Sequence, residues 1–196
     1  MEKIAPVDYP VHKLIRQRWS PRAFSDKTIS NENLNSLFEA ARWAPSSFNE
    51  QPWFFSYARK EDSTKFKLIL NCLSEKNQLW AKTAPLLMVT IAKTAFDHNG
   101  KPNPHAWHDV GQAISSFTLQ AMSLGIYCHQ MAGFSRSQIS DNLQIPNGFE
   151  PVSAVAIGYL GDSDNLTEDQ QIRERVPRFR KKQTEFVFSG IFPKKS

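Results

Sequence analysis

Two pairs of arginines lie near opposite ends of the sequence and suggest the first chemistry. Arg18 and Arg22 flank Ser20 on a short segment, and Arg178 and Arg180 stand one residue apart close to the C-terminus. Planar guanidinium groups and a hydroxyl suit a phosphate monoester, because several charge-assisted hydrogen bonds can converge on its oxygens. A surface pair is the commoner explanation for either pair alone, whereas together they could complete one phosphate site.

A polar loop bracketed by prolines, Pro45–Trp53, reads Pro-Ser-Ser-Phe-Asn-Glu-Gln-Pro-Trp. Ser46, Ser47, Asn49 and Gln51 supply hydroxyl and amide groups that match the polar edge of a flat heterocycle. The two prolines restrict the freedom of the loop. This composition is unusual for a plain connector and predicts a binding loop.

A third segment, His129-Gln-Met-Ala-Gly-Phe134, combines two small residues with a position directly after a long apolar stretch. Ala132 and Gly133 would let a ligand approach the backbone closely. An exposed backbone N–H at this point could therefore bond to a ligand nitrogen.

The elements that must hold these segments are indicated by apolar spacing. Helical spacing predicts helices over residues 11–18, 30–43, 63–73, 109–124 and 134–143, and a turn or short helix over 77–82. Apolar and aromatic runs predict strands over residues 53–58, 86–92 and 151–160. Residues 96–104 form a polar loop able to cover a pocket, and the last segment is polar until Phe186. Helices that alternate with strands place the fold in the mixed α/β class.

Length and composition fit a single domain spanning residues 1–196. The chain has 196 residues, of which 40% are hydrophobic and 12% aromatic, enough for a core. No stretch approaches the roughly 18–20 apolar residues of a membrane-spanning helix, and the first residues lack the apolar run of a secretory signal, so we expect a cytoplasmic protein. Cys72 and Cys128 are the two cysteines, and their apolar surroundings predict buried free thiols.

The net charge of +5 leaves a nucleic-acid-binding module as an alternative. The basic residues gather in the last quarter of the chain: Arg173, Arg175, Arg178, Arg180, Lys181, Lys182, Lys194 and Lys195. No reader motif accompanies them, and the aromatic residues lie mostly in apolar segments rather than between the cations. A solvated basic tail is the simpler interpretation.

A metal enzyme built on His105, His108 and Asp109 is the second alternative. Two histidines three apart with a carboxylate can ligate a metal, but this spacing is common and no convincing further ligands accompany it. In the simpler interpretation, His108 and Asp109 stand at the start of the central helix, where a carboxylate is favoured by the helix dipole.

Taken in order, the segments resemble the nitroreductase family of FMN enzymes. The matching motifs are Arg18-Trp-Ser20-Pro-Arg22, Pro45-Ser46-Ser47-Phe-Asn49-Glu-Gln51-Pro52-Trp53, His108-Asp109-Val110-Gly111-Gln112-Ala113, Met131-Ala132-Gly133-Phe134 and Arg178-Phe-Arg180. The similarity runs from about Leu14 to Val187, and the proline-bracketed loop is its most specific part. Ala132 and Trp80 depart from the pattern, since several relatives have Glu and Lys at these places.

The resemblance implies an α+β fold with a central, mostly antiparallel sheet surrounded by helices, in an intertwined homodimer with active sites at the subunit interface. Arg18, Ser20, Arg178 and Arg180 would hold the FMN phosphate. Arg22 would lie by the N1/O2 edge of the flavin, where a cation stabilises the charge of the reduced ring. The complete set of implied cofactor-binding residues is Arg18, Trp19, Ser20, Arg22, Pro45, Ser46, Ser47, Asn49, Asn77, Met131, Ala132, Gly133, Arg178 and Arg180.

Within that set, Asn77 would contact the pyrimidine or ribityl region, and the backbone at Ala132 and Gly133 would face flavin N5. Residues of the proline-bracketed loop would reach the flavin of the neighbouring subunit. No side chain need act as an acid or base, since FMN carries the chemistry. The implied activity is hydride transfer from NADH or NADPH to nitroaromatics, quinones or free flavin by a ping-pong mechanism, with no nucleic-acid or membrane partner. The residues of these motifs are most similar to those of a branch of the family that includes flavin reductases.

Overall fold

A four-stranded antiparallel sheet forms the centre of the computed structural model, which describes residues 3–192. The strands are β1 (Trp53–Arg59), β2 (Leu86–Lys93), β3 (Ile126–Met131) and β4 (Phe149–Tyr159), in the spatial order β1-β2-β4-β3. β2 lies inside the sheet, and its residues from Leu86 to Ala92 are buried. This arrangement confirms the expected α+β class and the antiparallel sheet.

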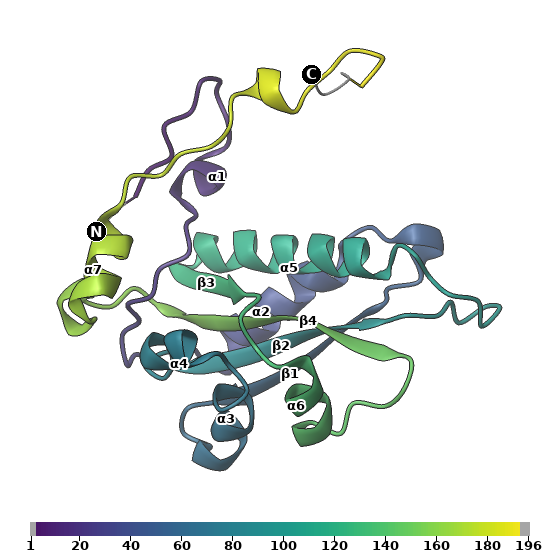
Figure 1. The fold of residues 1–196 in the computed structure, drawn as a ribbon, viewed down its shortest axis with the longest axis horizontal. Helices are drawn as coiled ribbons and strands as arrows, with labels where there is room; N and C mark the ends of the chain where they lie inside the picture. Colours follow the sequence, from purple (N-terminus) through teal and green to yellow (C-terminus); the bar gives the residue numbers. More distant parts are fainter. Residues whose placement is uncertain (1–2, 193–196) are drawn as a thin grey trace.

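Helices cover both faces of the sheet (Figure 1). The helices α2 (Asn31–Arg42) and α5 (Ala106–Ser123) pack on one face, and α3 (Ser63–Leu70), α4 (Glu75–Ala81) and α6 (Arg136–Asn142) pack on the other. Successive side chains of β2 alternate between the two cores: Leu86 and Met88 join the α2–α5 core, and Leu87 and Val89 join the opposite one. β2 is thus buried on both faces, as its continuous apolar run indicates.

The predicted helices form close to their expected positions. The Ser30 hydroxyl accepts a hydrogen bond from the Asn33 N–H and caps α2, which ends before Trp43. α5 begins at Ala106, three residues before the predicted start, and Gly125 follows it with φ of +69°, as expected of a C′ glycine. Cys72 and Cys128 are buried and free, as predicted.

Two elements have no counterpart in the sequence-based prediction. β3 occupies part of the segment interpreted as a ligand-binding turn, and α7 (Glu168–Arg175) lies in the polar C-terminal stretch. Short 3-10 turns occur at Ser47–Asn49, Ser163–Asn165 and Gln183–Glu185.

The N-terminal lead, the short helix α1 (Lys13–Gln17) and the C-terminal run lie together above the sheet (Figure 1). Beyond the last 3-10 turn the C-terminal run is exposed, including the apolar side chains of Phe186, Val187, Ile191 and Phe192. Lys194 and Lys195 lie outside the described residues. None of the described helices has both the length and the apolar character needed to cross a membrane.

Candidate functional site

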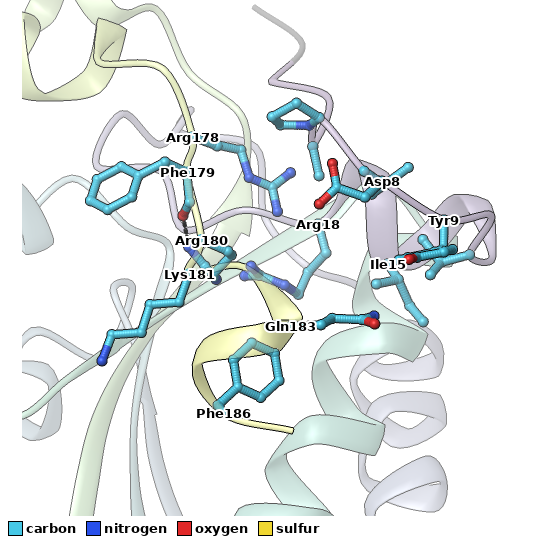
Figure 2. A pocket seen from close by; sticks show the side chains of 14 residues that line it. Asp8, Tyr9, Ile15, Arg18, Arg178, Phe179, Arg180, Lys181, Gln183 and Phe186 are labelled. Carbon is cyan, nitrogen blue, oxygen red and sulfur yellow. Dashed lines mark hydrogen bonds between the residues drawn. The ribbon is translucent and has the colours of Figure 1, made fainter. Parts of the chain in front are cut away.

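Three arginines from the two ends of the chain line one cavity of about 340 Å³ (Figure 2). Arg18 follows α1, and Arg178 and Arg180 lie on the C-terminal run beyond α7. The fold therefore brings Arg18 of the first pair together with both arginines of the second pair. Ser20 belongs to the same group, because the Arg18 Nη1 lies 3.5 Å from its hydroxyl oxygen.

The cavity is strongly positive. Four of its lining residues are cations and Asp8 is its single carboxylate, and within residues 3–192 none of the three guanidinium groups forms an ion pair with an acid. Burial lowers the pKa of the Arg18 guanidinium, and the nearby charge of Arg180 lowers this pKa further. The pKa of Arg178 is lowered by burial and by both neighbouring arginines. A bound anion would relieve this repulsion.

Arg178 has a structural task in addition. Its Nη1 donates hydrogen bonds to the carbonyl oxygens of Lys3, at 2.8 Å, and Arg16, at 2.7 Å. Arg178 thereby joins the C-terminal run to the N-terminal lead and to α1. The Arg180 guanidinium bonds to the Phe179 carbonyl of its own segment and leaves more of its donors available to a ligand.

Arg22 lies apart from the three-arginine cavity. It lines a second cavity of about 450 Å³ together with Asn77, Trp80 and Ser74. Its guanidinium Nη1 lies 3.6 Å from Oε2 of Glu174, a residue of α7 whose side chain is 2% exposed. A cation and an amide at one cavity provide donors for the polar edge of a planar ring.

A histidine of β3, His129, holds the turn between Arg18 and Arg22. His129 Nδ1 donates a hydrogen bond to the Pro21 carbonyl at 2.8 Å, and its ring packs against Trp80 at 4.5 Å between ring centroids. Burial lowers the pKa of His129 to about 4, and the charge of Arg22 acts in the same direction against the opposing effect of the Pro21 carbonyl. The imidazole is therefore neutral near pH 7 and serves as a donor.

The turn at Ala132 and Gly133 begins directly after β3. The Gly133 carbonyl accepts hydrogen bonds from the Asn77 side chain, at 3.0 Å, and from the Ser74 N–H, at 2.8 Å. A Cβ at Gly133 would lie 2.8 Å from Asn77 Nδ2 and 3.0 Å from Ser74 Oγ, so a larger residue could not keep this packing. Glycine fixes the turn against Asn77, and Ala132 beside it is exposed.

The proline-bracketed loop is held from the start of α5. The buried Asp109 carboxylate accepts the Ser47 N–H at 2.9 Å, and the Ser46 hydroxyl accepts the Gln51 N–H at 3.0 Å. Asn49 and Phe48 are exposed, the latter at 81%. The loop is thus fixed at its base and presents its middle to solvent.

The loop and the arginine cavity lie at opposite ends of α5. Asp109 holds the loop at the N-terminal end of this helix, whereas Gln17 of α1 lines a small cavity with Met122 at the C-terminal end. The 18 residues of α5 correspond to a rise of roughly 27 Å. One chain alone therefore does not bring the loop to the arginines.

Three residues position the candidate site in roles that no sequence pattern indicates: Glu174, His129 and Asp109. Each acts on a segment more than 60 positions away along the chain, so no local spacing could indicate the contact. A buried acid in a polar helix, as at Glu174, leaves no trace in an apolar pattern.

The two alternative site hypotheses gain no support from the geometry. Among the described residues, no group of three or more His, Cys, Asp or Glu side chains could hold a metal ion, and His108 bonds with Asp109 instead. Two of the C-terminal cations, Arg173 and Arg175, pair with the acids Asp169 and Asp164. These pairs reduce the basic surface that a nucleic acid would need.

Comparison with known proteins gives a consistent family match. A family model described as "Nitroreductase family" matches residues 15–73 and 60–159. A crystal structure described as an oxidoreductase containing FMN superposes with a TM-score of 0.91 at 39% identity, covering 97% of both chains.

The names of similar proteins are consistent with this family. A protein of Archaeoglobus fulgidus named "Putative NADH dehydrogenase/NAD(P)H nitroreductase" is 29% identical over 161 residues, covering 80% of this chain and 88% of its own. The 4-nitrobenzoate reductase of Pseudomonas putida is 21% identical over 209 residues, covering 85% of this chain and 92% of its own.

Proposed function

Because the chain belongs to the nitroreductase family, we propose that it is an FMN-dependent oxidoreductase that transfers a hydride from NADH or NADPH to a small planar acceptor. Nitroaromatics, quinones and free flavin are the acceptors of suitable shape. The observation that carries the proposal is the cavity in which Arg18, Arg178 and Arg180 converge without a carboxylate partner among the described residues.

The donor set of this cavity fits the phosphate of FMN. A phosphate monoester carries close to two negative charges, which three guanidinium groups can neutralise through forked hydrogen bonds. The Ser20 hydroxyl near Arg18 adds a neutral donor. The lowered pKa values of Arg18 and Arg178 reflect burial and crowding of like charges, which such a ligand would offset.

The second cavity fits the ring system. Arg22 and Asn77 offer donors for the pyrimidine edge, and the exposed backbone at Ala132 with the compact Gly133 offers a close approach to N5. When bound, FMN would supply the hydride-accepting and hydride-donating centre. The protein's own residues bind the phosphate, orient the ring and place a positive charge beside its N1/O2 edge. Trp19, which is buried, and Met131, at the end of β3, would support these contacts.

A complete site requires a second copy of the chain. The proline-bracketed loop, with Pro45, Ser46, Ser47 and Asn49, lies one helix length from the arginines of its own chain. A two-fold axis that passes beside the middle of α5, perpendicular to it, would place the α5 helices of the two copies antiparallel, so that the loop of one copy lies near the arginines of the other. The exposed apolar residues of the C-terminal run supply surface for wrapping around the second copy. We therefore include an intertwined homodimer of single-domain subunits in the proposal.

Donor and acceptor would use the same open face of the site in turn, which predicts ping-pong kinetics. Parallel lines in double-reciprocal initial-rate plots would support this order. Intersecting lines would contradict it, because they require both substrates in the site together.

The decisive experiment is an absorption spectrum of the purified protein between about 300 and 550 nm, before and after anaerobic addition of NADH or NADPH. Flavin bands that bleach would support the proposal and identify the preferred donor. A colourless protein that also takes up no added FMN would refute it.

A further inference from the structure

Glu174 is a buried carboxylate in α7, a helix whose residues are mostly polar and exposed. Its side chain is 2% exposed, and Gln170 and Glu174 are the buried residues of α7. Burying a charged group is costly unless it is paired and hydrogen-bonded. The contacts of the Glu174 carboxylate therefore indicate the role of α7.

Among the described residues, the hydrogen bonds and the ion pair of the Glu174 carboxylate all go to the turn at Arg22 and Ala23. Oε1 accepts the backbone N–H of Arg22 at 2.8 Å and that of Ala23 at 3.3 Å, and Oε2 faces the Arg22 guanidinium at 3.6 Å. The same carboxylate thus holds the backbone of Arg22 and its side-chain charge. Lys3 adds a positive charge nearby and donates to the Glu174 backbone carbonyl at 2.6 Å.

Glu174 lies behind Arg22 as seen from the ligand cavity. Arg22 lines the cavity that contains Asn77, whereas Glu174 lines a separate cavity of about 140 Å³ with Trp19. Glu174 Oε2 and Trp19 Nε1 are buried atoms that find no hydrogen-bond partner within residues 3–192, so the Arg22 guanidinium is the main charge that Oε2 meets there. The carboxylate does not line the ligand cavity and can act on a ligand only through Arg22 or at a distance.

We propose that Glu174 is a positioning residue that fixes Arg22 at the edge of the flavin and partly neutralises its charge, thereby lowering the reduction potential of the bound FMN. This inference rests on the proposed function. A cation beside the ring favours the reduced, negatively charged form, and a carboxylate behind that cation weakens the effect. The arrangement sets the potential by charge without contacting the ring.

The variant Glu174→Gln tests the idea because its amide oxygen can still accept the two backbone N–H groups while its charge is lost. We expect the FMN midpoint potential, measured in the holoenzyme by equilibration with reference dyes, to shift upward. In the Arg22→Gln background the same replacement should shift the potential by less than half as much. A merely structural role of Glu174 would not move the potential in this coupled manner.

Asp164→Asn is the matched control, because Asp164 pairs with Arg175 at the surface and its loss changes the net charge equally. The control should leave the potential at the wild-type value. An unchanged or lowered potential in Glu174→Gln, or an equal shift with and without Arg22, would overturn the inference.

If Glu174→Gln does not fold, Glu174→Asp provides the test. It keeps the charge but withdraws the carboxylate, so we expect faster hydrogen exchange at the Arg22 and Ala23 amides and a smaller upward shift of the potential. Unchanged exchange and an unchanged potential would contradict the anchoring role. A wild-type protein that binds no FMN would instead refute the proposed function, and the amide exchange would still report on Glu174.

Discussion

Replacement of His129 by asparagine should remove a specific part of the pH dependence of stability. The imidazole is largely buried between Trp80 and the Pro21 carbonyl, and its pKa falls from 6.5 to about 4, mainly because of burial. Between about pH 6.5 and about pH 4 the unfolded chain binds a proton at this residue and the folded chain does not. The free energy of unfolding contributed by His129 therefore falls as the pH drops from about 6.5 to about 4, and it is constant at lower pH.

The size of this effect follows from the pKa difference. Each pKa unit corresponds to about 1.36 kcal/mol, so the shift of His129 amounts to about 3 kcal/mol. Carboxylates also titrate in this range, so the useful quantity is the difference between wild type and His129→Asn. The asparagine Nδ2 can replace the Nδ1 donor to Pro21, whereas the contact with Trp80 is lost. Wild type should therefore be the more stable at pH 7, and its advantage should shrink by about 3 kcal/mol towards pH 4.

Urea unfolding followed by tryptophan fluorescence at about pH 7 and about pH 4 measures both proteins. One protein concentration is used throughout, because the stability of the proposed homodimer would depend on concentration. His105→Asn serves as the control, because it removes an exposed imidazole that makes no contact with this turn. Parallel pH profiles for wild type and His129→Asn would refute the reasoning. An NMR titration of the His129 ring with a midpoint near 6.5 would refute it as well.

Three further predictions follow from the geometry. Arg180→Gln should weaken FMN binding by at least about tenfold, since it removes an uncompensated positive charge from the proposed phosphate cavity. Fluorescence titration with FMN measures the affinity, and an affinity equal to that of the wild type would contradict this role. Cys128, whose pKa burial raises to about 12, should resist alkylation by iodoacetamide in the folded protein and react only after unfolding. Gly161→Ala should lower the free energy of unfolding by more than about 2 kcal/mol, because the new Cβ would lie 2.4 Å from the Phe24 backbone carbon. Gly111→Ala, at an exposed position of α5 with open space around the new Cβ, provides the comparison in urea unfolding and should not lower the free energy of unfolding, because alanine is the better helix former.

The elements that the sequence indicates are those with an apolar pattern. β2 and α5 bury long apolar runs and were predictable, whereas α7 buries Gln170 and Glu174 and exposes its one apolar residue, Ile172. Its hydrophobic pattern is thus inverted, and the capping box between Thr167 and Gln170 helps to form the helix instead. β3 is only six residues long and mixes buried residues with polar ones, so its sequence carries too weak an alternation to predict a strand.

The residue types of the site were predictable, but their partners were not. Guanidinium groups, hydroxyls and amides indicate a phosphate and a polar ring by their chemistry alone. The carboxylate that holds Arg22 stands 152 positions away, and the imidazole that holds Pro21 stands 108 positions away. Such pairings depend on the order of strands in the sheet, which no local spacing determines.

The role of the proline-bracketed loop depends on its backbone conformation as well as on its composition. Phe48, Asn49 and Gln51 all have positive φ angles, which cost non-glycine residues roughly 1 kcal/mol each. The Asp109 carboxylate and the Ser46 hydroxyl hold the loop in this conformation from its base. Backbone strain of this kind persists only where the surrounding structure enforces it, and it is common at functional sites. The strained residues are exposed and lie about one helix length from the arginine cavity of their own chain, so the proposed homodimer would give this strain a purpose by presenting a rigid loop to the second copy.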